Sequence, residues 1–133
     1  MFYLSEGTEV FSNDKFEGAQ VIQWLFFEQY SHKPFIAISH FWYLTGKAQE
    51  YQEALQQKQA QSYGALRVIK QHLAENEFFA GDRSTIADIG LFAYTHVAGE
   101  GGVDLTIVAA LQIWINRVKT QPLYLNLTQL NLI

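Results

Sequence analysis

The sequence has 133 residues, which is enough for one folded domain. Apolar residues make up 49%, aromatic residues 15% and charged residues 17% of the chain, which excludes a disordered protein. The net charge is −4 with scattered Lys and Arg, and Cys is absent, so a basic nucleic-acid-binding domain, disulfides and a cysteine nucleophile are excluded.

The first helix is predicted to begin near Lys15, because the preceding residues Ser12–Asp14 offer N-cap side chains. Val21–Phe27 is apolar at every position except Gln23. An ordinary amphipathic helix has only one apolar stripe. Part of this helix is therefore expected to face something outside the domain.

Pro34 is expected to kink or break this helix near Ser31–Lys33, because proline lacks a backbone donor and clashes with the preceding turn. A second helical piece is predicted from Pro34 to Leu44, and Gly46 should end it. A long helix should follow over Gln49–Ala74, with one apolar stripe toward the core and Gln, Lys and Glu elsewhere.

After a loop over Glu75–Ser84, Thr85 is predicted to open a short helix of almost purely apolar residues. A short helix that is apolar all round should be central and buried, and we expect this one to end at Gly99. The run Gly99–Gly102 is interpreted as a helix C-cap and flexible loop, since it lacks the Lys-Ser/Thr of a phosphate loop. A last helix is predicted over Thr106–Thr120, and the fold class is all-α.

The most specific local pattern is Thr85-Ile86-Ala87-Asp88. Thr85 at the N-cap can accept a hydrogen bond from the helix backbone, and Asp88 can accept one from the N-cap amide. This arrangement predicts a structural capping box rather than a catalytic acid or a metal ligand. Its loss through Asp88→Ala is expected to destabilise the fold by roughly 0.5–2 kcal/mol, toward the upper end in a buried setting.

The segment Phe79–Ile89 resembles the capping-box segment of the glutathione S-transferase C-terminal domain. Phe16–Phe41 resembles the long first helix of that domain, while Glu100–Leu105 and Ile113–Val118 resemble its late loop and following helix. The resemblance covers the chain from about Phe2 to Tyr124. It implies a helical bundle of that type, with a buried central helix starting at Thr85.

Members of this family begin with a thioredoxin-like domain that supplies nearly all of the glutathione site and the group that activates the thiol. None of that domain is recognised here, and Tyr3–Thr8 looks like its last residues and the linker. We therefore expect residues 1–14 to be a linker remnant, residues 15–124 the helical domain and residues 125–133 an apolar tail. A fragment, a split gene product and a lone C-terminal domain all remain open.

No catalytic residue is predicted, and a zinc site is improbable because the four His residues lack metal-ligand spacing and cysteine partners. The candidate substrate-binding residues are Gln20, Trp24, Phe27 and Ser31, which form one stripe of the first helix. The resemblance implies that this helix lines the cleft where the electrophile binds. The alternative is that Trp24 and Phe27 are simple core residues.

Three functions remain open: a non-catalytic half that associates with itself or with a thioredoxin-like chain, the electrophile-binding part of an active transferase, and a small-molecule-binding or scaffold bundle. No cofactor is expected, except glutathione where a thioredoxin-like domain is supplied. The expected partners are a second copy or that domain, with no nucleic acid and no membrane.

The last fourteen residues, Thr120–Ile133, carry no charge but are too short and too polar to cross a bilayer. Their leucines are expected to lie on an apolar surface, with a frayed terminus as the alternative. The N-terminus lacks the pattern of a signal peptide, so we expect a cytoplasmic domain.

Overall fold

The computed structural model describes residue 8, residues 10–122 and residue 124. This part of the chain contains helices and no strand, which confirms the all-α prediction. The expected tail over residues 125–133 and most of the expected linker lie outside the described residues. The elements in chain order are α2 (Lys15–Phe27), η1 (Glu28–His32), α3 (Lys33–Leu44), α4 (Gln52–Leu73), α5 (Ile86–Thr95), η2 (Ala98–Gly101) and α6 (Ala109–Lys119).

Helix α2 begins where the sequence predicts, and Asp14 is its N-cap. The Asp14 carboxylate accepts a hydrogen bond of 2.8 Å from the backbone N–H of Glu17. Val21 is fully buried, whereas the side chain of Phe26 is 71% exposed. The apolar run therefore faces both the core and the outside, as predicted.

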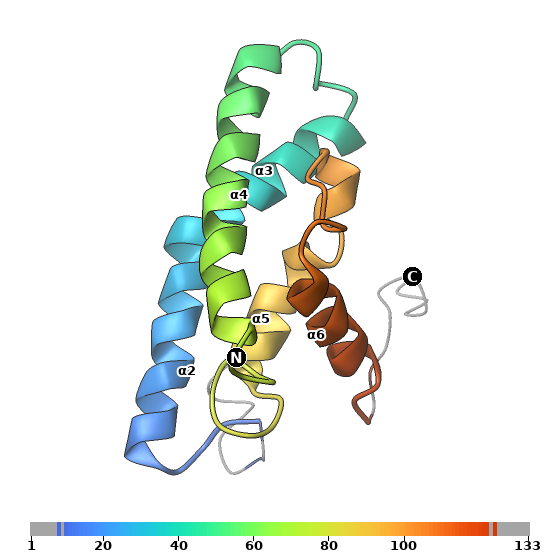
Figure 1. The fold of residues 1–133 in the computed structure, drawn as a ribbon. Coiled ribbons are helices and arrows are strands. Elements are labelled where there is room, and N and C mark those ends of the chain that lie inside the picture. Colours follow the sequence, from blue (N-terminus) through green and yellow to red (C-terminus); the bar gives the residue numbers. More distant parts are fainter. Residues whose placement is uncertain (1–7, 9, 123, 125–133) are drawn as a thin grey trace, which may run out of the picture.

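The predicted break before Pro34 takes a different form. Residues Glu28–His32 form a π-helical turn, in which the N–H of Lys33 donates to the carbonyl of Glu28. A π-turn inserts an extra residue into the hydrogen-bond ladder, which accommodates a proline without interrupting the helix. The chain consequently continues into α3 at a marked angle to α2 (Figure 1).

Helix α4 is the longest element, and Figure 1 shows α2 at its lower left, α3 extending behind it to the upper right, and α5 and α6 on the right. Helix α5 lies in the middle and contributes Ile86, Ala87, Leu91 and Phe92 to one apolar core. Trp114 of α6 is fully buried in the same core. This arrangement confirms the bundle with a central helix that begins after Thr85.

The glycine-rich segment differs from the prediction. Helix α5 ends at Thr95 instead of Gly99, and Ala98–Gly101 forms the short 3-10 helix η2, which packs against α3. A Cβ on Gly101 would lie 2.8 Å from the backbone nitrogen of His40. The glycine therefore permits close approach of two backbones, and the interpretation as a flexible loop was wrong.

Helix α6 begins at Ala109, three residues later than predicted from Thr106. The Asp104 carboxylate accepts hydrogen bonds from the backbone N–H and the hydroxyl of Thr106, which hold this segment in a turn. Ser, Thr and Asp side chains compete in this way with helical hydrogen bonds near helix ends.

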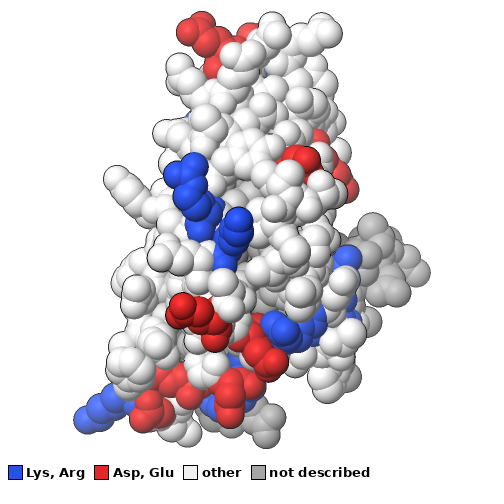
Figure 2. All heavy atoms as spheres, in the orientation of Figure 1, with Lys and Arg blue, Asp and Glu red and all other residues white. Residues whose placement is uncertain are grey.

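No helix in the described part of the chain is long and apolar enough to span a membrane. On the face drawn in Figure 2, acidic and basic side chains alternate over the lower half, without a broad area of one sign.

Candidate functional site

The start of α5 holds a buried polar cluster of Thr85, Asp88 and Trp114, which we call the capping cluster. One carboxylate oxygen of Asp88 accepts from the backbone N–H of Thr85 at 3.0 Å, and the other accepts from the indole N–H of Trp114 at 2.8 Å. The N–H of Ala87 donates to the Thr85 hydroxyl at 3.3 Å. The predicted capping box is thus present, with an additional donor from α6.

Asp88 is fully buried, and burial raises the pKa of its carboxyl group. The hydrogen bonds from Thr85, Trp114 and Phe79 oppose that rise, because each stabilises the ionised form. Both carboxylate oxygens have partners, so the geometry supports a structural role.

A second buried polar cluster lies at the π-helical turn and consists of Glu28, His32 and Thr95, which we call the π-turn cluster. The hydroxyl of Thr95 donates to the carbonyl of Leu91 at 2.6 Å, so it must accept at 2.7 Å from Nε2–H of His32. Nδ1 of His32 is then an acceptor, and it has no hydrogen-bond partner among the described residues.

Burial lowers the pKa of His32 from 6.5 to about 4, so the ring is neutral at pH 7. Glu28 precedes His32 by four residues on the same turn and is also buried. Burial raises the pKa of Glu28, while a hydrogen bond from Gln29 and the charge of Lys33 partly oppose the rise. This cluster went unnoticed in the sequence because a break was expected here.

The predicted substrate-binding residues Gln20, Trp24, Phe27 and Ser31 are all half-buried. The Trp24 ring lies 4.7 Å from the ring of His72 on α4 and 4.7 Å from that of Phe79. Trp24 also contacts Phe27 edge to face. These contacts show that Trp24 and Phe27 pack against other side chains of the domain. That they also bind an electrophile stays a prediction.

A different side of α2 is open. Helices α2 and α5 approach closely, since a Cβ on Gly90 would lie 3.0 Å from a methyl group of Leu25. The residues near Leu25 and Gly90 in the sequence include exposed apolar ones: Ile22 and Phe26 on α2, and Ile89 on α5, which is 45% exposed. We call Ile22, Phe26 and Ile89 the α2/α5 face.

The contribution of α5 to this face was not predicted, because the apolar composition of α5 indicated burial on all sides. Ile89 and Ala93, four residues apart, are nevertheless exposed. Their shared spacing of four is the signal that could have revealed an outward stripe. Among the described residues, no group of three or more His, Cys, Asp or Glu is placed to hold a metal ion.

Comparison with known proteins gives consistent results. The family model of the glutathione S-transferase C-terminal domain matches residues 25–122. A glutathione S-transferase of Pseudomonas fluorescens Pf-5 is 38% identical, with a TM-score of 0.91 over 94% of this chain and 63% of its own. One from Xanthobacter autotrophicus Py2 is 37% identical, with a TM-score of 0.89 over 91% and 60%.

A curated relative, the disulfide-bond oxidoreductase YfcG of Escherichia coli K12, is 24% identical over 92% of this chain and 57% of its own length. The chain thus spans between 57% and 63% of the length of these three relatives. Because the family model matches most of the residues, and the capping cluster and all-α fold agree with it, the chain belongs to the glutathione S-transferase family and carries its C-terminal domain.

Proposed function

We propose that this chain is the helical half of a glutathione S-transferase-type protein and is non-catalytic by itself. In this proposal it associates through the α2/α5 face with a thioredoxin-like domain from outside these 133 residues, and dimerises through the outer side of α2. A cytoplasmic location belongs to the same proposal.

The observation that carries the proposal is the exposure of the α2/α5 face. Phe26 on α2 is 71% exposed, Ile22 one turn earlier on the same helix is 39% exposed, and Ile89 on α5 is 45% exposed. Phe16 on α2 and Tyr30 on η1 add exposed side chains to the outer side of this continuous helical segment. Several large exposed apolar side chains on one helix support an interaction site there, because leaving them in water is unfavourable.

What the buried polar groups do supports the proposal that the chain is non-catalytic by itself. A transferase must lower the pKa of the glutathione thiol with positioned donors. In the described part of the chain, Asp88 is engaged by the capping cluster, and His32 is fully buried in the π-turn cluster. Glutathione would therefore be bound and activated only where a thioredoxin-like domain is supplied.

The stripe of Gln20, Trp24, Phe27 and Ser31 would contribute a wall for the electrophile. Its support is the resemblance of this helix to the one that lines the cleft in the family, together with the half-exposed state of all four side chains. The rings of Trp24 and Phe27 would present an apolar, aromatic surface of fixed orientation, since Phe79 and His72 hold Trp24 in place.

Sedimentation velocity of the full chain tests the association. We expect oligomers at micromolar concentration, and weaker association for Phe16→Ser because it removes an apolar side chain, 74% exposed, from the outer side of α2. Phe41→Ser is the matched control, since Phe41 is 52% exposed but lies on α3 instead of α2. A monodisperse monomer, or equal weakening by both substitutions, would contradict the proposal.

A further inference from the structure

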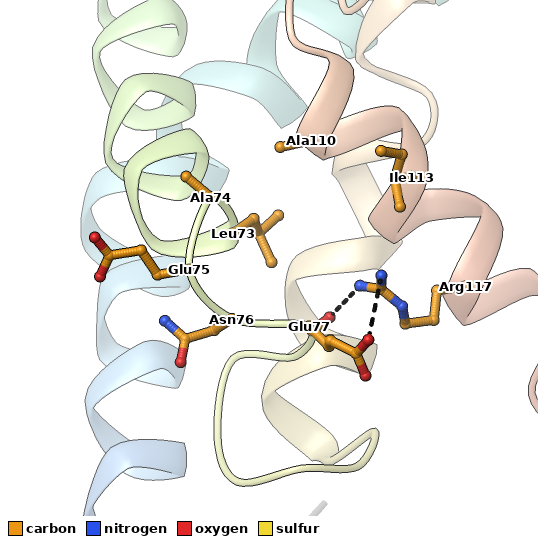
Figure 3. A pocket seen from close by; sticks show the side chains of 8 residues that line it. All are labelled: Leu73, Ala74, Glu75, Asn76, Glu77, Ala110, Ile113 and Arg117. Atoms are coloured by element: carbon orange, nitrogen blue, oxygen red, sulfur yellow. Dashed lines mark hydrogen bonds and ion pairs between the residues drawn. The ribbon is translucent and has the colours of Figure 1, made fainter.

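A pocket that lies apart from the α2/α5 face is formed by the end of α4, the loop after it, and α6 (Figure 3). Its volume is about 380 Å³, and it is open to solvent along one side. The pocket shares no residue with the α2/α5 face, so what it binds is independent of the proposed association.

One wall of this pocket is apolar. Leu73 at the end of α4 and Ala110 on α6 line it, and both are largely shielded from solvent. Ile113, one turn after Ala110, remains 57% exposed and lies beside the hollow (Figure 3). An aromatic or aliphatic group placed here would cover the side chain of Ile113 and release water from it.

The other end of the pocket holds Arg117, whose guanidinium is fixed by groups that carry no charge. Its Nη1 donates to the backbone carbonyl of Glu77 at 2.6 Å, and its central carbon lies 5.6 Å from the centre of the Phe78 ring. A guanidinium has five donors arranged as a planar fork, which matches a carboxylate in two-point contact.

The carboxylate already near Arg117 is loosely held. Oε1 of Glu77 lies 4.0 Å from Nη2 of Arg117, which is beyond hydrogen-bond distance, and the Glu77 side chain is 75% exposed. An exposed pair at this distance is weakened by water and salt. Figure 3 shows the two side chains meeting at the edge of the pocket.

We propose that this pocket binds a small amphiphilic carboxylate. Its apolar body lies against Leu73, Ala110 and Ile113, and its carboxylate takes the position of the Glu77 carboxylate on Arg117. Because Arg117 is already oriented by the Glu77 carbonyl and Phe78, little side-chain freedom is lost when the ligand binds. Glu75 is exposed to solvent on the opposite side, so its repulsion of the ligand is screened.

Naphthoate is a suitable probe, and its binding is followed by NMR on labelled isoleucine methyl groups of the full chain. We expect the Ile113 methyl to shift in a saturable way, with a dissociation constant in the millimolar range for a ligand of this size. Naphthylmethanol, which lacks the charge, should bind about ten-fold more weakly, since a charge-assisted contact contributes roughly that factor. Naphthylmethylammonium should bind no better than the alcohol.

Four variants separate the contributions. Arg117→Gln should reduce naphthoate affinity about ten-fold and leave naphthylmethanol unaffected. Glu77→Gln removes the competing carboxylate and should raise naphthoate affinity, a gain that misfolding cannot produce. Ile113→Ser removes the reporter methyl, so its binding is followed through the ligand's own proton signals, and it should weaken both ligands. Ile107→Ser, its matched control on an exposed site outside the pocket, should weaken neither.

Several results would overturn the assignment. An Ile113 methyl that does not shift with naphthoate would show that the pocket takes no such ligand. Equal affinities for naphthoate and naphthylmethanol, or an unchanged affinity in Arg117→Gln, would remove the role of the guanidinium. Tighter binding of the ammonium than of naphthoate would assign the pocket to organic cations through Glu75 and Glu77.

Discussion

The capping cluster and the π-turn cluster are both buried and polar, but they are satisfied to different degrees. Asp88 receives donors on both carboxylate oxygens, including the indole N–H of Trp114. His32 has a partner for Nε2 but none for Nδ1 among the described residues. Buried polar groups stabilise a fold when every donor and acceptor is paired, and they weaken it when one is left over.

This difference has a structural cause. The capping cluster lies at a helix start, where free backbone N–H groups need acceptors, so a buried carboxylate has a use there. The π-turn cluster lies within a continuous helix. The backbone N–H and C=O groups are already paired with one another there, so they offer Glu28 and His32 no hydrogen-bond partner. The first cluster is thus expected to be essential for stability and the second to be a weak point in acid.

The largest expected effect is that of Asp88→Ala. The substitution leaves the indole N–H of Trp114 and the backbone N–H of Thr85 buried without an acceptor. We expect a loss of about 3–4 kcal/mol in the free energy of unfolding, more than an exposed cap contributes, because several buried donors are orphaned together. Urea denaturation followed by far-UV circular dichroism measures the loss.

Asp88→Asn is the control for that experiment. Its amide oxygen can still accept from Trp114, but its amide nitrogen cannot accept from Thr85, so a smaller loss is expected. If the urea midpoints of wild type and Asp88→Ala coincide, the capping cluster does not hold the start of α5.

The second effect is a loss of stability in acid through His32. Its pKa is 6.5 in the unfolded chain and about 4 in the folded one, so the unfolded state binds more protons between these values. Stability therefore falls as the pH drops from about 6.5 to about 4, by about 3 kcal/mol in total. Above pH 6.5 the contribution of this group is constant.

The measurement is the difference in pH dependence between wild type and His32→Gln. Glu28 and Asp88 have raised pKa values, which act in the opposite sense, but they contribute equally to both proteins. The slope of stability against pH between 4 and 6.5 should be shallower in the variant. Parallel curves would show that His32 is not held neutral by burial.

The smallest expected effect is an increase in the free energy of unfolding caused by Glu28→Gln. Burial makes the charged carboxylate unfavourable, and a neutral amide of the same shape removes that penalty while its oxygen can still accept from Gln29. We expect stabilisation of about 1 kcal/mol or less at pH 7. Thermal unfolding at pH 7 and pH 4.5 checks it, because the gain should shrink as Glu28 becomes protonated. Destabilisation at pH 7 would mean that the Gln29 hydrogen bond and the Lys33 charge outweigh the cost of burying the carboxylate.

The sequence predicted features that depend on local chemistry. The capping box needs only Thr85 and Asp88 at a spacing of three. The family resemblance implied this box, and the structure contains it. The N-cap near Asp14 and the end of α3 before Gly46 are equally local. The indole donor from Trp114 could not be predicted, because it comes from a helix 26 residues away.

Features that depend on tertiary packing escaped prediction. Pro34 indicates a disturbance, but whether the helix breaks or widens into a π-turn depends on what α4 and α5 pack against. The run Gly99–Gly102 suggested flexibility, whereas Gly101 is needed because the backbone of α3 passes close to it. The α2/α5 face was predicted only in part. The sequence showed that α2 has more apolar residues than one core can cover, but which of them stay exposed depends on how α5 packs against α2.

Turnover of glutathione with a chlorodinitrobenzene electrophile, measured on the pure chain, tests the central claim most directly. In the described part of the chain, the buried titratable side chains Asp88, Glu28 and His32 belong to the two structural clusters, and this assignment leaves none of them to activate a thiol. It therefore predicts a rate equal to that of the uncatalysed reaction. A rate clearly above it, proportional to protein concentration, would contradict the proposal that this helical half is non-catalytic.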